Sequence, residues 1–156
     1  MRDTIRHDGM PERILAIGDV HGCHRALATL LEQLTVTAAD TIVFLGDIID
    51  RGPSSKQVVD ELLLLRKKCK VALIMGNHEE MMRDALSGRG LLNTWLDAGG
   101  QSTLKSYGGT VDGIPSDHIR LLLSSQPFFE TETDIFVHAC LESKISLPNQ
   151  TSEFLR

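Results

Sequence analysis

The stretch Thr41-Ile42-Val43-Phe44-Leu45-Gly46-Asp47 joins an apolar run to a glycine and an acidic residue. A nearly continuous apolar run that ends at a glycine is typical of a strand buried on both faces of a parallel sheet. Apolar residues then recur at helical spacing from Val58 to Leu65, which predicts a helix after the strand. The stretch therefore predicts a β-α unit with Asp47 at the carboxyl end of its strand.

The same order of residues occurs on both sides of this unit. The run 14–17 leads into Gly18-Asp19, and the run 71–75 leads into Gly76-Asn77. Together the three segments predict a β-α-β-α-β core of the α/β class. Because right-handed crossovers bring the carboxyl ends of parallel strands to one edge, we expect Asp19, Asp47 and Asn77 to lie close together.

The remaining pattern predicts a single domain over residues 13–156, preceded by a flexible segment at 1–12. Further helices are predicted at 79–86 and 91–96, and a third is predicted to begin with Ser116 as its cap. A last strand is predicted at 134–137, with His138 at its end. We expect Glu79 to complement the dipole of its helix, His24 and His118 to be solvated, and Trp95 to belong to the core or a lid.

Composition limits the class of protein. With 156 residues, 42% hydrophobic and 24% charged, the chain can bury the core of one globular domain. A net charge of -5 argues against a nucleic-acid partner, and the apolar runs are too short for a membrane span. Cys23, Cys69 and Cys140 are odd in number and far apart, which suits reduced thiols in the cytoplasm.

Polar residues at the predicted strand ends point to metal chemistry. Asp19 and His21 can face one cation from a tight turn, and Asp47 has enough lone pairs to bridge two cations. Asn77 offers a carbonyl oxygen, and His138 offers a second imidazole. Mixed oxygen and nitrogen ligands without a thiolate suit manganese, iron or zinc better than magnesium.

Three neighbours of these residues have the chemistry of phosphoester cleavage. His78 follows Asn77 directly and can act as the acid for a leaving oxygen. Asp50 can fix the tautomer of that imidazole by accepting a hydrogen bond from its other ring nitrogen. Arg51 carries the guanidinium fork that matches phosphate.

Four motifs carry a resemblance to a known family. Gly18–Gly22, Gly46–Gly52 and Gly76–Glu79 resemble the signature motifs of calcineurin-like metallophosphoesterases of the phosphoprotein phosphatase type, and Val137-His138-Ala139 resembles the fourth. The stretch from Trp95 to Gly108 is similar to small bacterial serine/threonine phosphatases and symmetrical diadenosine tetraphosphatases.

The resemblance implies a fold of two packed mixed sheets with helices outside, in α-β-β-α layers, and a site with two divalent ions. Manganese is the expected metal, with iron or zinc as alternatives. The first ion would be held by Asp19, His21 and Asp47, and the second by Asp47, Asn77, His138 and one further histidine. By the same resemblance, the acid, its partner and the phosphate clamp would be His78, Asp50 and Arg51.

The sequence departs from that family in its last part. Members usually continue to a Gly-His pair that completes the second ion's ligands, whereas no histidine follows His138 here. We therefore expect a truncated chain, or a substitute ligand from water, Asp134, Glu142 or a neighbouring chain. The second sheet would be incomplete, and its exposed edge would favour a homodimer.

The leading functional hypothesis is hydrolysis of phosphoserine or phosphothreonine in proteins by a metal-bound hydroxide. One alternative is symmetrical hydrolysis of bis(5'-nucleosyl) tetraphosphates at the same site. A second is a catalytically impaired family member that binds one metal ion or a phosphate group without turnover. The substrate would accordingly be a phosphorylated protein or a nucleotide.

Overall fold

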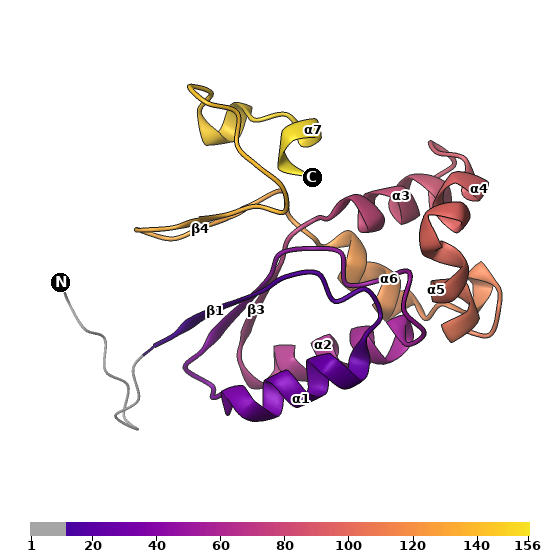
Figure 1. The fold of residues 1–156 in the computed structure, drawn as a ribbon, viewed down its shortest axis with the longest axis horizontal. Helices are drawn as coiled ribbons and strands as arrows, with labels where there is room; N and C mark the ends of the chain where they lie inside the picture. Colours follow the sequence, from indigo (N-terminus) through magenta and orange to yellow (C-terminus); the bar gives the residue numbers. More distant parts are fainter. Residues whose placement is uncertain (1–11) are drawn as a thin grey trace.

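A three-stranded parallel sheet forms the centre of the computed structural model, which describes residues 12–156 (Figure 1). Its strands are β1 (Ile14–Ile17), β2 (Thr41–Phe44) and β3 (Lys70–Leu73), in the order β1-β2-β3. Ile17, Phe44 and Leu73 are in register at their carboxyl ends. The expected convergence of the strand ends is therefore present. Residues 1–11 of the segment that was expected to be flexible lie outside the described residues.

Two long helices cover one face of this sheet, as Figure 1 shows. Helix α1 (His24–Leu34) turns Leu27 and Leu31 inward, and α2 (Ser55–Lys68) buries one side that includes Val58 and Leu62. These side chains pack in one core with Ile42 and Phe44 of the central strand, both fully buried. Burial of such a stripe is what stabilises each helix on the sheet.

A run of short helices leaves the end of β3 and returns to the sheet. It contains α3 (Asn77–Leu86), α4 (Leu92–Trp95), the π-helical turn η1 (Leu96–Gly100), α5 (Gln101–Ser106), the 3-10 turn η2 (Val111–Gly113) and α6 (Ser116–Leu123). Helix α3 begins at Asn77, two residues before the predicted start. Ser116 is the first residue of α6 rather than its cap, because Pro115 occupies the cap position and no side-chain cap bond forms.

A second, antiparallel sheet lies on the other face. It pairs β4 (Phe129–Glu130) with β5 (Ile135–Phe136), and Phe129 and Phe136 pack against Val43, Ala72 and Ile74. The sequence predicted β5 as a longer strand and did not predict β4. Helices, parallel sheet and hairpin thus stack in the order expected for the mixed α/β fold, and the predicted fold class is confirmed.

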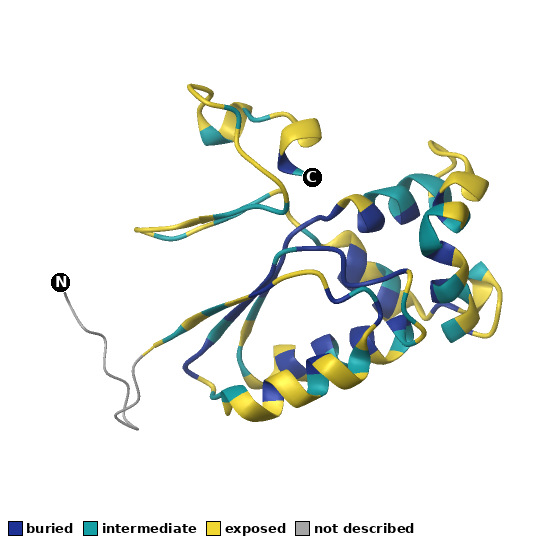
Figure 2. Cartoon of the chain, in the orientation of Figure 1, coloured by how far each residue is buried: buried dark blue, intermediate teal, exposed yellow. Residues whose placement is uncertain are grey.

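The last 30 residues, 127–156, are called the C-terminal arm below. After β5 the arm contains the 3-10 turn η3 (Leu147–Asn149) and the short helix α7 (Ser152–Leu155). Figure 2 shows most of the arm exposed, in contrast to the buried sheet and the strand ends. Within residues 12–156, no helix combines the length and apolar character needed to cross a membrane.

Candidate metal centre and active site

The turn after β2 places Asp47 at the middle of the site. Gly46 has φ +107°, and a Cβ there would lie 2.7 Å from the backbone nitrogen of Gly76 and 2.9 Å from Nδ1 of His138. Only glycine therefore lets the three segments approach so closely. Asp47 is buried, and its own φ of 48° turns the chain sharply.

Glu79 supports this turn from below, a role that differs from the predicted one. Its buried carboxylate accepts the backbone N–H groups of Asp47 at 2.8 Å, Ile48 at 2.9 Å and Gly76 at 3.1 Å. Burial, followed by the charge of Asp47, raises the pKa of Glu79 to about 7, and the N–H donors oppose that rise. Glu79 thus joins the turn after β2 to the turn after β3, instead of only complementing a helix dipole.

His21 and His138 both point their Nε2 atoms at Asp47. Nδ1 of His21 lies 2.9 Å from the carbonyl of Ile49, and Nδ1 of His138 lies 2.8 Å from the carbonyl of Leu45. Since a carbonyl only accepts, each Nδ1 carries the proton and each Nε2 presents a lone pair. The lone pair of His21 accepts from Nη1 of Arg51 at 2.9 Å. These Nε2 atoms lie 3.5 Å and 3.6 Å from Oδ2 of Asp47.

The remaining predicted ligands, Asp19 and Asn77, complete this arrangement. Oδ1 of Asn77 lies 3.2 Å from Nε2 of His138, so two lone-pair atoms face each other where a cation would satisfy both. Oδ2 of Asp19 lies 3.8 Å from Nε2 of His21, on a side chain that is 55% exposed. The donor set therefore fits divalent cations.

Ligand atoms within 4.8 Å of one another form two groups among the described residues: His21, Asp47 and His78, and Asp19, Asp47 and His138. Asp47 belongs to both groups, as a bridging ligand must. Asp19 groups with His138, although the resemblance assigns these residues to different ions. The structure brings the predicted ligands together, and their division between two ions stays a prediction.

His78 and Asp50 form a buried pair beside the candidate ligands. Nδ1 of His78 lies 2.8 Å from Oδ2 of Asp50, and the two side chains are 1% and 0% exposed. Burial lowers the pKa of His78, but the hydrogen bond to Asp50 and the charges of Asp47 and Asp50 outweigh it and raise the pKa above its ordinary value. Nδ1 is committed to Asp50, so Nε2 is the nitrogen free for a reacting group.

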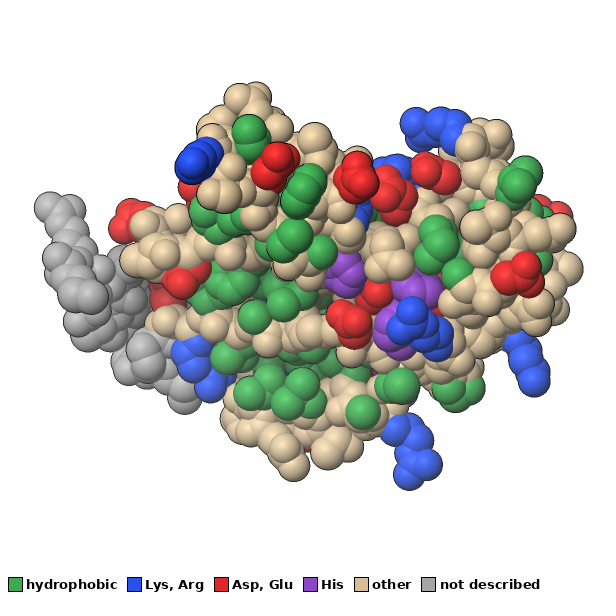
Figure 3. All heavy atoms as spheres, turned by 45° about the horizontal axis from the view of Figure 1, so that its top comes forward, with side chains coloured by type: hydrophobic (Ala, Val, Ile, Leu, Met, Phe, Trp, Pro, Cys, Tyr) green, Lys and Arg blue, Asp and Glu red, His purple; other side chains and the backbone are tan. Residues whose placement is uncertain are grey.

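Arg51 lies at the open side of the site. Its Nη1 is 2.9 Å from Nε2 of His21, and its backbone N–H donates to the carbonyl of Gly99 at 3.2 Å. Figure 3 shows histidine, acidic and basic side chains gathered in the middle of one face of the molecule. The exposed guanidinium is thus placed where it could bind a phosphate oxygen.

The backbone of the site lies in an unusual conformation. Left-handed φ angles occur at His21 (44°), Asp47 (48°), Asp50 (70°) and Arg51 (63°). Residues other than glycine, asparagine and aspartate rarely adopt this region. Such angles gather at sites where the surrounding structure fixes an unfavourable turn.

Three contacts of Asp50 were not foreseen from the sequence. Oδ2 accepts the indole N–H of Trp95 at 2.9 Å, and Oδ1 accepts the hydroxyl of Thr103 at 2.6 Å. Oγ of Ser55 lies 3.2 Å from the backbone nitrogen of Asp50. Trp95 belongs to the core, which was one of the two predicted alternatives, core or lid. Its hydrogen bond to Asp50 joins residues 45 positions apart in the sequence.

The other two histidines of the described residues lie outside the site, and neither is simply solvated. His118 is buried, with Nδ1 2.9 Å from the hydroxyl of Tyr107 and Nε2 3.2 Å from Asp60. His24 lies 3.6 Å from Glu61. The prediction of a solvated His118 was wrong because its charged partner, Asp60, is distant in sequence. His24 remains partly exposed, beside Glu61.

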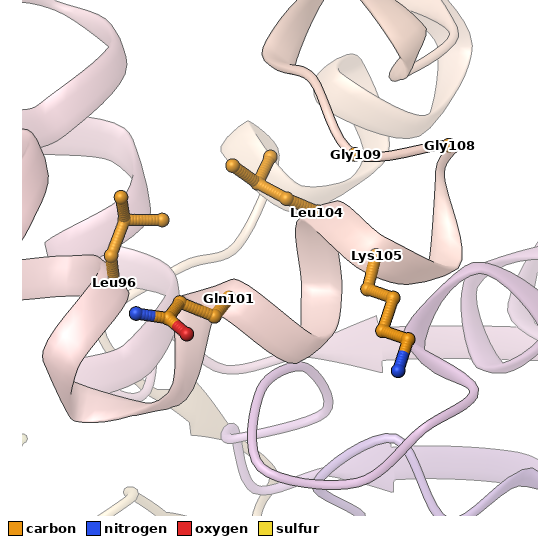
Figure 4. A pocket seen from close by; sticks show the side chains of 6 residues that line it. All are labelled: Leu96, Gln101, Leu104, Lys105, Gly108 and Gly109. Carbon is orange, nitrogen blue, oxygen red and sulfur yellow. The ribbon is translucent and has the colours of Figure 1, made fainter.

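A cleft of about 550 Å³ runs along the outer side of α5 (Figure 4). Leu96 and Leu104 supply apolar surface, and Gln101 and Lys105 supply polar groups. Gln101 and Lys105 are exposed, whereas Thr103 of the same helix is buried against Asp50. The cleft therefore faces away from the candidate metal ligands.

A parallel sheet that gathers carboxylate, imidazole and amide ligands at its strand ends provides the kind of site that metal-dependent hydrolases use. The profile of the calcineurin-like phosphoesterases matches residues 12–145. The chain belongs to this family, whose members use a dinuclear metal centre.

Curated relatives narrow the comparison. The chain is 32% identical over 144 residues to the symmetrical bis(5'-nucleosyl)-tetraphosphatase of Nitrosomonas europaea, covering 88% of this chain and 46% of that protein. It is 30% identical to the enzyme of the same name from Burkholderia thailandensis, covering 81% and 42%. The chain thus spans somewhat less than half the length of these relatives.

Solved structures support the fold. A candidate diadenosine tetraphosphatase superposes with a TM-score of 0.71 at 21% identity, covering 91% of this chain and 56% of that one. A serine/threonine phosphatase from Saccharomyces cerevisiae gives 0.63 at 20% identity, covering 90% and 45%. At these identities the likeness concerns the fold alone.

Proposed function

We propose that this chain carries the hydrolytic site of a symmetrical bis(5'-nucleosyl)-tetraphosphatase, which splits its substrate into two nucleoside diphosphates. The observation behind the proposal is that Nε2 of His21 and of His138 approach the same oxygen of Asp47 at 3.5 Å and 3.6 Å. The curated relatives support this substrate over phosphoserine or phosphothreonine, the leading hypothesis from sequence.

Two divalent cations, with manganese as the first choice, would be held by Asp19, His21, Asp47, Asn77 and His138. When bound, they supply positive charge for the phosphoryl oxygens and lower the pKa of water. Both Nδ1 protons are held by backbone carbonyls, so the ligand nitrogens need no change of tautomer on metal binding.

The remaining steps belong to side chains of the chain itself. Water adds to one inner phosphorus and loses a proton to the solvent, and the bond from that phosphorus to the central bridging oxygen breaks. His78 gives its Nε2 proton to this departing oxygen, while Asp50 keeps the Nδ1 proton in place at 2.8 Å. Arg51 binds an oxygen of the phosphate chain through its guanidinium.

The test is a product analysis with the chain supplied with manganese. Diadenosine tetraphosphate should give ADP alone, faster than a phosphothreonine peptide gives inorganic phosphate. Formation of AMP and ATP would contradict symmetrical cleavage, and faster turnover of the peptide would restore the serine/threonine hypothesis. No turnover of either substrate, with one metal ion or none per chain, would favour the impaired family member.

A further inference from the structure

The carboxylate of Asp50 is fully buried. Within the described residues, its hydrogen bonds do not include the candidate metal ligands Asp19, His21 or His138. Its interactions run instead to His78 on one side and to the segment 95–103 on the other. A buried carboxylate needs several donors to remain stable. The identity of those donors decides how firmly Asp50 can hold its partner.

Thr103 and Trp95 each bind one oxygen of Asp50. The Thr103 hydroxyl donates to Oδ1 at 2.6 Å and accepts the backbone N–H of Asp50 at 2.9 Å. The Trp95 indole donates to Oδ2 at 2.9 Å, the oxygen that also lies 2.8 Å from Nδ1 of His78. With both oxygens fixed, the carboxylate cannot rotate without losing a hydrogen bond.

The segment that carries these donors is shaped for this contact. A Cβ on Gly100 would lie 2.5 Å from the Trp95 ring, so only glycine lets the indole reach its place. Gly99, with φ +127°, turns its carbonyl to the backbone N–H of Arg51 at 3.2 Å. One short segment therefore fixes the residues on both sides of the peptide bond from Asp50 to Arg51.

We propose that Trp95 and Thr103 are positioning residues for the hydrolytic reaction: they fix Asp50, and Asp50 fixes the imidazole of His78 toward the leaving oxygen. This inference rests on the proposed function, which assigns His78 as the acid. Trp95 and Thr103 do not touch the substrate. Their loss leaves the metal ligands in place and frees the His78 ring to change its tautomer and orientation.

The leaving group provides a test that separates this role from general stabilisation. An acid contributes about 100-fold to 10,000-fold when a basic oxygen departs, and little when the oxygen is already a good leaving group. Thr103→Val and Trp95→Phe should therefore slow phenyl phosphate at least ten times more than 2,4-dinitrophenyl phosphate. A variant that merely loosens the fold would slow both substrates equally.

The experiment compares kcat for the two aryl phosphates in the parent chain and four variants. Thr103→Ser keeps the hydroxyl and should restore parental selectivity, and Thr29→Val on the exposed side of α1 provides the same substitution away from the site. Thermal unfolding checks that each variant is folded. Equal slowing of both esters in a folded Thr103→Val or Trp95→Phe chain would overturn the proposal. If one of the two variants is unfolded, the other decides.

A second measurement works without metal or turnover. Proton NMR of the chain labelled with nitrogen-15 histidine should contain a downfield Nδ1–H signal of His78, identified by its loss in His78→Ala. Exchange of this proton with water should be at least tenfold faster in Thr103→Val and Trp95→Phe, and unchanged exchange would overturn the proposal. A parent chain with the protected proton but no hydrolysis would contradict the proposed function alone.

Discussion

The two turns 46–52 and 76–79 and the C-terminal arm contribute to one site with unequal structural support. Asp47, Asp50, His78 and Glu79 of the turns are buried and joined by hydrogen bonds across the sheet edge. His138 of the arm is fixed through one nitrogen, to the carbonyl of Leu45 at 2.8 Å. Beyond it the arm exposes Leu141, Ile145 and Phe154.

This difference separates the parts of the site that depend on the core from those that depend on the arm. A ligand anchored in a buried network is positioned before any ion arrives, whereas one on an exposed segment is positioned partly by the ion itself. The arm is also linked to helix α3, next to the second turn, by an ion pair between Arg156 and Glu80. Substitutions in the turns should therefore change stability or turnover, whereas substitutions in the arm should mainly change metal affinity.

The largest effect is expected from Asp47→Asn. Removing one group that stabilises developing charge typically lowers kcat by about 100-fold to 1,000-fold, and loss of a bridging carboxylate should reach at least that range. The near-isosteric amide can keep the hydrogen bond from the N–H of His78, 3.1 Å from Oδ1. Elemental analysis should find fewer than two ions per chain, and an unchanged metal content would contradict the bridge.

His138→Ala tests the arm's contribution to the same centre. Loss of even an outer partner of a metal ligand weakens binding by about 10-fold to 100-fold, so loss of the ligand should weaken one ion at least as much. Because His138 lies outside the main core, urea unfolding of the metal-free chain should change little. Titration of manganese against both chains measures the affinity. A large drop in metal-free stability would instead place the arm within the cooperative core.

Glu79→Gln tests the support beneath the turns. A glutamine oxygen can replace only part of an acceptor that serves four backbone N–H groups, so we expect a loss of about 1–3 kcal/mol in the free energy of unfolding. Glu80→Gln is the matched control, since Glu80 forms partly exposed ion pairs that contribute less than about 1 kcal/mol. Equal urea midpoints for the two variants would argue against the role given to Glu79.

The smallest effect concerns Asp40, at the opposite end of the sheet. Hydrogen bonds from Arg13 lower the pKa of Asp40 from 3.8 to about 2, against the opposing effect of burial. The folded chain thus binds this proton more weakly than the unfolded chain. The resulting stability, on the order of 1 kcal/mol because Arg13 is partly exposed, is complete above pH 3.8 and lost as the pH falls through about 2.

Unfolding of the parent and of Asp40→Asn across that pH range measures this contribution. The stability difference should narrow as the pH falls, while activity at neutral pH stays parental. A difference that does not depend on pH would mean that the variant changes packing instead of proton binding. The comparison also calibrates how much a stability change alone alters turnover.

The parts of the site that could be predicted from the sequence are those carried by a strand end. Asp19, Asp47 and Asn77 follow apolar runs and glycines, so local pattern and sheet geometry together place them. Glu79 had a weaker signal: it stands three residues after Gly76 in a capping box, a pattern that was interpreted only as a dipole effect.

The contacts that could not be predicted join residues far apart in sequence. Trp95 and Thr103 reach Asp50 across 45 and 53 residues, and His118 lies 3.2 Å from Asp60 of α2. Each contact depends on how the helices α3 to α6, which follow β3, pack together. The spacing of apolar residues in the sequence does not determine that packing. The strand β4 was missed because it is only two residues long and depends on its partner β5.

The left-handed backbone at His21 and Arg51 also has an evolutionary consequence. For such residues this conformation costs about 1–2 kcal/mol relative to an ordinary turn, whereas glycine adopts it readily. His21→Gly or Arg51→Gly would therefore relieve strain while deleting a ligand or a phosphate contact. A population selected only for a stable fold would drift toward glycine at these positions, so the two side chains persist there only under selection for what they bind.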